Sequence, residues 1–149
     1  MMRPKKLYVG CSLTHATQEF RDGIEKLKDA LRQEGHEILD FLWVLDKKPS
    51  PKAVFEWDIL NCVKNCDGMV AICDHPSLGL GYELAEAAHL GKPILALAQK
   101  EVRISNLILG AAEVLPSFRL KRYEDINKDI TPLVNDWLTS LETLGQSHS

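Results

Sequence analysis

The chain has 149 residues, a length typical of one domain with a single hydrophobic core. With 45% hydrophobic residues, 26% charged residues and a net charge of −3, the composition excludes a disordered chain and provides no basic excess for binding nucleic acid. The apolar runs are far shorter than the ~20 residues needed to span a membrane, and no signal peptide is recognisable, so we expect a cytoplasmic protein without a membrane partner.

Patterns typical of strands and helices alternate along the chain. The first two are a buried strand at 6–10 and a helix whose apolar residues recur from Phe20 to Leu31 and which ends at Gly35. The remaining predicted elements, in chain order, are a strand at 38–42, a polar loop at 46–52, a helix at 54–65, a strand at 69–73, a loop at 74–79, a helix at 81–90, a strand at 94–98, a short helix at 104–112, a strand at 114–120, and a last helix marked by apolar residues from Ile126 to Leu141.

Strands and helices that alternate with short connections predict an α/β fold. We expect a three-layer, doubly wound (flavodoxin- or Rossmann-like) parallel five-stranded sheet with helices on both faces. A single domain would occupy residues 1–144, followed by a flexible tail at 145–149. In such sheets the ligand binds beyond the carboxyl ends of the strands, where the strand order reverses. That edge would carry residues 10–15, residues 74–83 and the segment after Ala98.

The four cysteines match neither a CxxC motif nor a zinc-finger spacing. Cys62 and Cys66 lie four residues apart, which predicts two small buried side chains on one face of a helix. No clustered His/Cys set suggests a metal site, and without a secretory signal a disulfide framework is not expected. We therefore expect no metal and no other cofactor.

The segment at 76–83, Pro-Ser-Leu-Gly-Leu-Gly-Tyr-Glu, lies on the predicted ligand edge. Two glycines near a helix start can cradle a phosphate, although the pattern is neither GxGxxG nor GxxxxGK[ST]. Glu83 falls in or near the first helical turn, where an acid of purely structural role favours the helix dipole. The same dipole would keep Glu83 ionised in a cleft, as a nucleophile for sugar chemistry must be. Both interpretations stay open.

Asp58, early in the predicted helix at 54–65, is a second candidate carboxylate. Alone, it is typical of a solvated or first-turn acid. Paired with Glu83 across a cleft, it would supply the two carboxylates of glycosyl transfer, one attacking the anomeric carbon and the other handling protons. Retaining glycosidases hold two such groups ~5–5.5 Å apart.

Five segments together resemble the nucleoside 2-deoxyribosyltransferase superfamily and, within it, the 2'-deoxynucleoside 5'-monophosphate N-glycosidases. The most specific motif is Ser-Leu-Gly-x-Gly-Tyr-Glu at 77–83, and the resemblance extends over residues 6–112. The segments are residues 7–13, 58–67, 76–84, 91–95 and 104–111.

The resemblance implies that Glu83 is the nucleophile that forms a covalent glycosyl-enzyme. It implies that Asp58 positions the substrate or protonates the departing base, and that Tyr8 lies beside the sugar. From the residues alone, Tyr8 can equally be a core aromatic with a hydrogen-bonded hydroxyl. The family also implies nucleotide metabolism or salvage, and a homodimer or higher oligomer with a shared active site in which Ser105 acts across the interface. Further substrate contacts are expected from Gly10, Ser12, Ser77, Gly79, Gly81, Ser105 and Asn106.

Ser77 and Ser105 favour a 5'-phosphorylated substrate. The transferases of the superfamily carry Asp and Asn at the matching positions, whereas the monophosphate glycosidases carry serine at both. A carboxylate would repel a phosphate, and a hydroxyl can donate a hydrogen bond to it. From sequence alone, each serine can also be an ordinary helix cap.

The chain departs from the family in the loop after the first strand. Thr14, followed by His15, stands where the glycosidases carry an arginine. Phosphate affinity must then depend on hydroxyls, backbone amides or other cations, with Arg21 and Arg103 as candidates.

A second departure concerns spacing. The distance along the chain from Asp58 to Asp67 is one residue longer than the family pattern. Asp58 remains the best match to the family's acid, and Glu56 is the alternative.

The sequence therefore predicts an enzyme that hydrolyses the N-glycosidic bond of (deoxy)nucleoside 5'-monophosphates. The products would be a free base and a sugar 5-phosphate, released through a glycosyl intermediate on Glu83. One alternative is a 2-deoxyribosyltransferase that exchanges bases between deoxynucleosides. Another is a non-catalytic nucleotide-binding module, which the presence of Tyr8, Asp58 and Glu83 disfavours.

Overall fold

Five parallel strands form one sheet in the order β2-β1-β3-β4-β5. The computed structural model describes residues 3–147, with side chains as far as residue 144. The strands are β1 (Lys6–Cys11), β2 (Glu37–Leu39), β3 (Gly68–Ile72), β4 (Ile94–Gln99) and β5 (Phe118–Tyr123). The helices are α1 (Gln18–Gln33), α2 (Leu42–Leu45), α3 (Pro51–Phe55), the π-helix η1 (Glu56–Val63), α4 (Leu78–His89), α5 (Asn106–Val114) and α6 (Ile130–Ser147). The predicted five-stranded parallel sheet is confirmed.

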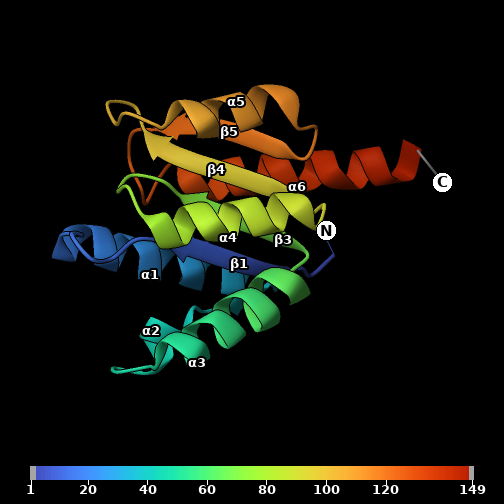
Figure 1. The fold of residues 1–149 in the computed structure, drawn as a ribbon. Coiled ribbons are helices and arrows are strands. Elements are labelled where there is room, and N and C mark those ends of the chain that lie inside the picture. Colours follow the sequence, from blue (N-terminus) through green and yellow to red (C-terminus); the bar gives the residue numbers. More distant parts are fainter. Residues whose placement is uncertain (1–2, 148–149) are drawn as a thin grey trace.

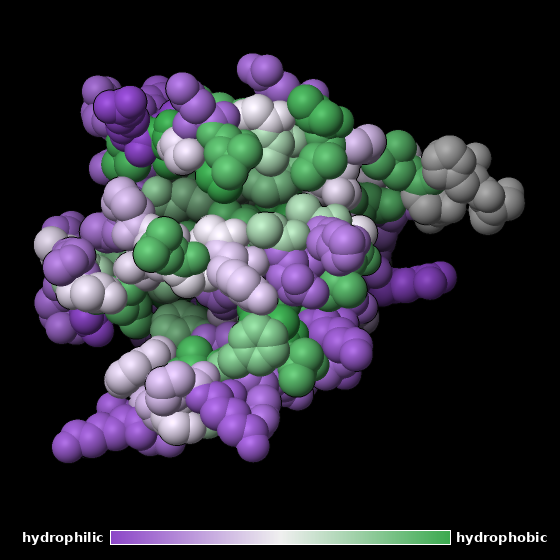
Figure 2. All heavy atoms as spheres, viewed as in Figure 1, coloured by the Kyte–Doolittle hydropathy of each residue, from purple (hydrophilic) through white to green (hydrophobic). Residues whose placement is uncertain are grey.

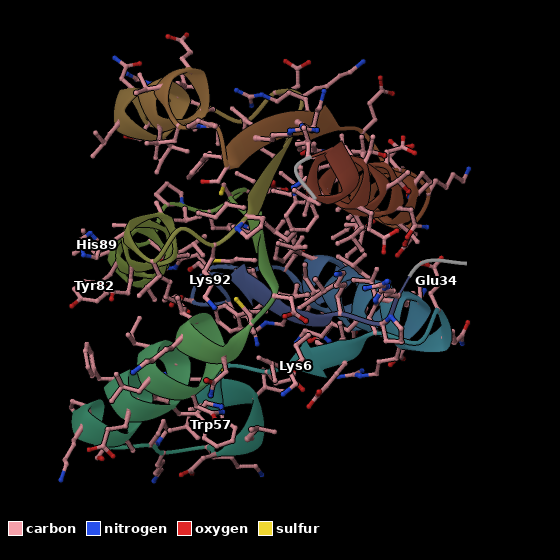
Figure 3. All side chains as sticks on the ribbon, turned by 90° about the vertical axis from the view of Figure 1, so that its right-hand side faces the viewer. Lys6, Glu34, Trp57, Tyr82, His89 and Lys92 are labelled. Atoms are coloured by element: carbon pink, nitrogen blue, oxygen red, sulfur yellow. The ribbon has the colours of Figure 1, made fainter. Side chains whose placement is uncertain are left out.

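Helices cover both faces of the sheet (Figure 1). The view turned by 90° shows η1, α4 and α5 on one side of the strands and α1 and α6 on the other (Figure 3). Every residue of β3 is buried, and so is all of β4 except its last residue. Strands covered on both faces have continuous apolar sequences, which explains why these two were recognisable from sequence. Among the described residues, no helix combines the length and the hydropathy of a membrane span.

Helix α1 shows how local sequence sets the element boundaries. The Thr17 hydroxyl accepts the N–H of Phe20 at 3.1 Å and caps the helix, as N-cap residues do. Ile24 and Leu31 are buried on the face that packs on the sheet. Gly35, with φ +96°, ends the helical segment in a conformation that glycine adopts readily.

Several predicted boundaries are wrong by a few residues. The second strand ends at Leu39 rather than 42, because the chain turns into α2. Residues 51–52 are helical rather than loop, since the Ser50 hydroxyl accepts the N–H of Ala53 and caps a helix that begins at Pro51. That helix continues without a break through η1 to residue 65.

The C-terminal elements also begin later than predicted. The last strand begins at Phe118 rather than 114, because α5 extends to Val114 and a turn at 116–117 follows. The last helix begins at Ile130 rather than near 126, since the Asp129 carboxylate binds the backbone amides of 124 and 125 in a turn. Helix α6 then reaches Ser147, past the expected boundary at 144/145, and residues 148–149 lie outside the described part of the chain.

Close packing joins α6 to the sheet. Trp137 is buried, and a Cβ atom added to Gly68 at the start of β3 would lie 2.7 Å from its ring. Only glycine allows this approach without a shift. Cys62 and Cys66 are buried as predicted, and all four cysteines are free thiols.

The topology places the candidate residues on one edge of the sheet. Strand order reverses between β1 and β3, and the segments that follow β1, β3 and β4 leave from their carboxyl ends. Ligands of doubly wound sheets bind at such a reversal. The predicted ligand edge is therefore the edge at which α4 begins.

Candidate active site

Glu83 lies on the face of α4 that packs on the sheet. It follows the buried Leu80 by three residues and precedes the buried Ala87 by four, which places all three on one helical face. The Ser77 hydroxyl accepts the N–H of Leu80 at 3.1 Å, so α4 begins at Leu78 rather than 81. Glu83 therefore lies in the second turn. The predicted first-turn position, and with it the interpretation as a structural first-turn acid, is wrong.

Tyr8 lies directly beneath Glu83. It is fully buried in β1, between Leu39 of β2 and Met69 of β3, and its hydroxyl donates a hydrogen bond to Oε2 of Glu83. Gly10 lies two residues further along the same face of the strand. A Cβ atom there would meet Met69 Cε at 3.0 Å and a methyl of Leu80, so its absence lets α4 approach the sheet. The expected juxtaposition of Tyr8 and Glu83 is present.

Asp58 is the acid that the structure brings to the interior. It is 8% exposed, and its Oδ1 accepts the N–H of Leu42 at 2.8 Å. Glu56, the alternative acid, is half exposed and lies 3.7 Å from Lys52 at the surface. Both acids belong to η1, whose i→i+5 hydrogen bonds take up more residues per turn than those of an α-helix. A π-helical turn can accommodate the additional residue that the sequence predicts between Asp58 and Asp67.

Burial, Tyr8 and Asp58 all affect the ionisation of Glu83. Burial raises the pKa of Glu83 to about 7; the hydrogen bond from Tyr8 lowers it and the charge of Asp58 raises it. Burial also raises the pKa of Asp58, and the Leu42 N–H lowers it. The expectation that Glu83 is kept ionised is thus wrong in part, because burial raises its pKa to about 7. Near neutral pH the Glu83 carboxyl is therefore only partly ionised.

The pKa of Tyr8 is raised well above its ordinary value, first by burial and then by Glu83, with a smaller contribution from Asp58. Tyr8 is therefore a neutral hydrogen-bond donor. The arrangement offers a carboxylate nucleophile, a donor that favours its ionised form, and a second carboxyl that can hold a proton.

Ser77 and Ser105 both cap helices. The Ser105 hydroxyl accepts the N–H of Leu107 at 3.2 Å at the start of α5, as Ser77 does for α4. In each cap the oxygen is the acceptor, so the hydroxyl hydrogen can still be donated to a ligand. The capping interpretation of each serine is confirmed, and a role in substrate binding stays a prediction.

The other predicted contact residues lie on or near the same edge. Gly79 and Gly81 form the first turn of α4, and no atom lies within 4 Å of where a Cβ of Gly81 would be. Ser12 is partly buried just after β1, and Asn106 is exposed at the start of α5. Their contacts with a substrate stay predictions.

Arg21 reaches the loop that follows β1. Its guanidinium donates to the carbonyl of Leu13 at 2.5 Å, next to Thr14, and the side chain is exposed. Burial raises the pKa of Cys11 at the end of β1 to about 12, with smaller opposing effects from cations including Arg21 and from Glu83. The positive charge of Arg21 and the Glu83 carboxyl therefore both act at the end of β1. The other candidate cation, Arg103, is exposed after β4.

Sequence reasoning missed a buried ion pair behind this site. Lys28 of α1 is 1% exposed and lies 2.8 Å from the Asp40 carboxylate, which follows β2. The pattern held a signal, since Lys28 is four residues after Ile24 and three before Leu31, on the buried face of the helix. Within residues 3–147, no group of three or more His, Cys, Asp or Glu side chains is arranged to hold a metal ion.

Comparison with curated sequences identifies several relatives, although no family model matches the chain. A protein of Thermofilum pendens named 2'-deoxynucleoside 5'-phosphate N-hydrolase 1 is 35% identical over 117 residues, which cover 74% of this chain and 80% of that protein. A Nematostella vectensis protein of the same name is 38% identical over 90 residues, 59% of this chain and 58% of that protein. The 5-hydroxymethyl-dUMP N-hydrolase of Rattus norvegicus is 46% identical over 56 residues, 36% of this chain and 34% of the rat protein.

Two solved structures share the fold. The CMP N-glycosidase of Clostridium botulinum aligns with a TM-score of 0.70 at 20% identity, covering 88% of this chain and 99% of that one. A 2-deoxyribosyltransferase of Bacillus psychrosaccharolyticus aligns with a TM-score of 0.56 at 22% identity, covering 86% and 95%. At these identities the likeness is one of architecture.

Proposed function

The chain belongs to the family of 2'-deoxynucleoside 5'-phosphate N-hydrolases, a family of enzymes, and from that premise we propose that it hydrolyses the N-glycosidic bond of nucleoside 5'-monophosphates. The products would be a free base and a sugar 5-phosphate. The observation that carries the proposal is the partly buried Glu83 carboxyl, hydrogen bonded to Tyr8 and close enough to Asp58 for the charge of Asp58 to affect its ionisation.

In the first step, an oxygen of ionised Glu83 attacks C1' of the sugar. The bond between C1' and the base breaks through an oxocarbenium-like transition state, and its electron pair passes to the base nitrogen. Asp58, in its protonated form, delivers a proton to the departing base. Tyr8 donates to the Glu83 carboxylate and orients the attacking oxygen.

In the second step, water releases the sugar. Asp58, now ionised, accepts a proton from a water molecule while the water oxygen bonds to C1'. The ester bond to Glu83 breaks and its electron pair returns to the carboxylate. Both carboxyl groups are then restored to their starting protonation states. Since burial places the pKa of Glu83 at about 7, a substantial fraction is ionised and ready to attack at neutral pH.

The substrate phosphate would lie at the edge where α4 begins. The Ser77 hydroxyl can donate to it, and the first turn of α4 presents backbone N–H groups. Arg21 replaces the missing arginine at position 14, because one guanidinium N–H binds the Leu13 carbonyl and other donors remain. In this arrangement Arg21, a residue of α1, supplies the positive charge that the loop after β1 lacks.

The second protomer of a homodimer would complete the site. Large apolar side chains are exposed over α3, α4 and α5: Phe55, Leu78, Tyr82, Leu107 and Val114 (Figure 2). An apolar face of this kind marks a protein contact, and a twofold axis would pair it with itself. The start of α5, with Ser105 and Asn106, would then approach the partner's substrate.

A cytoplasmic location of the protein stays a prediction.

The test is base release from a defined panel, followed by chromatography. The panel holds deoxyribo- and ribonucleoside 5'-monophosphates, 5-hydroxymethyl-dUMP and the matching free nucleosides. We expect release from monophosphates alone, and none with Glu83→Ala. Arg21→Gln should raise KM for monophosphates about 10- to 100-fold, since a hydrogen bond to a charged group is lost. The matched control, Arg103→Gln, should leave KM unchanged.

The runner-up function is base exchange between deoxynucleosides, which the architecture shared with a 2-deoxyribosyltransferase supports. A parallel reaction with a free acceptor base tests it. Exchange between unphosphorylated nucleosides would replace the hydrolase proposal. Binding of a monophosphate without turnover, unchanged in Glu83→Gln, would instead indicate a non-catalytic module.

A further inference from the structure

A buried charge lies behind the candidate active site. The Lys28 side chain is 1% exposed, and its Nζ lies 2.8 Å from Oδ1 of Asp40 and 3.2 Å from the Glu25 carboxylate. The same nitrogen lies 5.4 Å from the centre of the Phe41 ring. An ammonium removed from water in this way needs its partner, since a buried unpaired charge is strongly destabilising. The pair, together with Arg32 of the same helix, whose Nη2 lies 3.3 Å from Oδ2 of Asp40, therefore holds the backbone at Asp40 against α1.

The π-helix η1 binds Asp40 from the side opposite to α1. The carbonyl oxygen of Asp40 accepts a hydrogen bond from Trp57 Nε1 at 2.8 Å and from the Cys62 thiol at 3.4 Å. These two donors are five residues apart, the interval at which a π-helix closes its hydrogen bonds, so they lie on one face of η1. Figure 3 shows Trp57 directed from this helix toward the chain that follows β2.

Asp58 is attached to the same short segment. Two residues after Asp40, the N–H of Leu42 donates to Oδ1 of Asp58 at 2.8 Å. The residue between them, Phe41, is 8% exposed and anchors the segment in the core. A continuous set of contacts thus joins Lys28, on the opposite face of the sheet, to the carboxyl of Asp58.

We propose that the Lys28–Asp40 ion pair positions Asp58 for proton transfer. The pair fixes residues 40–42, so that the Leu42 amide occupies one oxygen of Asp58 and leaves the other for the departing base. Lys28 and Asp40 touch no reacting atom, and their effect passes through Asp58. The inference rests on the proposed function in that Asp58 handles the proton of the base.

The test removes both charges together. Replacing a buried ion pair by apolar residues of similar size is often neutral for stability, so the double variant Lys28→Met with Asp40→Leu should fold. Its KM should stay near the wild-type value, while kcat falls about 10- to 100-fold because the acid is misplaced. The matched control Glu25→Gln removes the other partner of Lys28 and should leave kcat unchanged. Wild-type kcat in a folded double variant would overturn the proposal.

A double-mutant cycle separates positioning from general damage. In an Asp58→Asn background, the double substitution should lower kcat no further, because its effect already requires the Asp58 carboxyl. An equal loss in both backgrounds would show that the ion pair supports the fold alone.

Amide hydrogen exchange tests the inference without any substrate. The Leu42 amide should exchange at least tenfold faster in the double variant, while the Val70 amide in β3 should keep its rate. If the wild-type protein hydrolyses no nucleotide but Leu42 exchange changes as expected, the proposed function fails and the positioning contact stands. Unchanged Leu42 exchange would overturn the inference whatever the activity.

Discussion

Replacing Glu83 by glutamine is expected to stabilise the fold at alkaline pH and to have little effect at acid pH. Burial raises the pKa of this carboxyl from its ordinary 4.5 to about 7 in the folded protein. The unfolded chain releases the proton near pH 4.5, whereas the folded chain retains it until about pH 7. The free energy of unfolding therefore decreases as the pH rises through this interval, and the loss is complete above the folded pKa.

The magnitude follows from the two pKa values. One pKa unit corresponds to about 1.36 kcal/mol, so ionised Glu83 lowers the free energy of unfolding by about 3 kcal/mol above pH 7. Glutamine keeps the shape and accepts the hydrogen bond from Tyr8, but it carries no charge. Glu83→Gln should therefore gain about 3 kcal/mol at pH 8, or roughly 6–12 °C in Tm. At pH 4.5 the gain should be less than about 0.5 kcal/mol.

Urea denaturation followed by circular dichroism at both pH values, at one fixed protein concentration, measures these differences. The matched control is Glu101→Gln, in the exposed turn after β4, which should stay within about 0.5 kcal/mol of wild type at both pH values. Equal stabilisation of Glu83→Gln at pH 8 and pH 4.5 would refute the reasoning, because the effect would then not come from the charge.

Three further variants test the contacts of the site and the packing behind it. Tyr8→Phe removes the donor that favours ionised Glu83, so the acid limb of the kcat/KM pH profile should move above pH 7. Asp58→Asn removes a nearby negative charge, so the same limb should move to lower pH while kcat falls about 10²- to 10⁴-fold; a shift in the same direction for both variants would contradict these contacts. Gly68→Ala should cost about 1–3 kcal/mol of unfolding free energy in urea titrations, because its methyl group would lie 2.7 Å from the Trp137 ring; wild-type stability would show that the ring moves freely.

The parts of the fold predicted from sequence are those whose signal is local. β3 and β4 are buried on both faces and therefore have uninterrupted apolar sequences. Helix α1 has a regular apolar face and a glycine stop at Gly35. The doubly wound arrangement followed from chirality rules that hold for nearly all βαβ units.

The errors occurred where capping or a tertiary contact decides the boundary. Gly79 and Gly81 have low helix propensity, which concealed the start of α4, although the Ser77 cap begins the helix before them. The sequence therefore predicts Glu83 about one turn closer to the start of the helix than the structure shows. Its raised pKa depends on burial between α4 and the sheet, a property of the assembled fold that no spacing reveals.

The π-helix explains why a longer spacing does not displace the acid. An extra residue in an ordinary α-helix rotates the residues after it by about 100° relative to those before it. Asp58 and Cys62, four residues apart, lie on one helical face. In η1 both remain buried, because wider turns absorb the residue, and Glu56 stays at the surface. The same wide turns bring Trp57 and Cys62 together on the Asp40 carbonyl. The π-helical geometry therefore also links η1, which carries Asp58, to the Lys28–Asp40 ion pair. The position of Asp58 in this way depends on α1, which is far from it in the sequence.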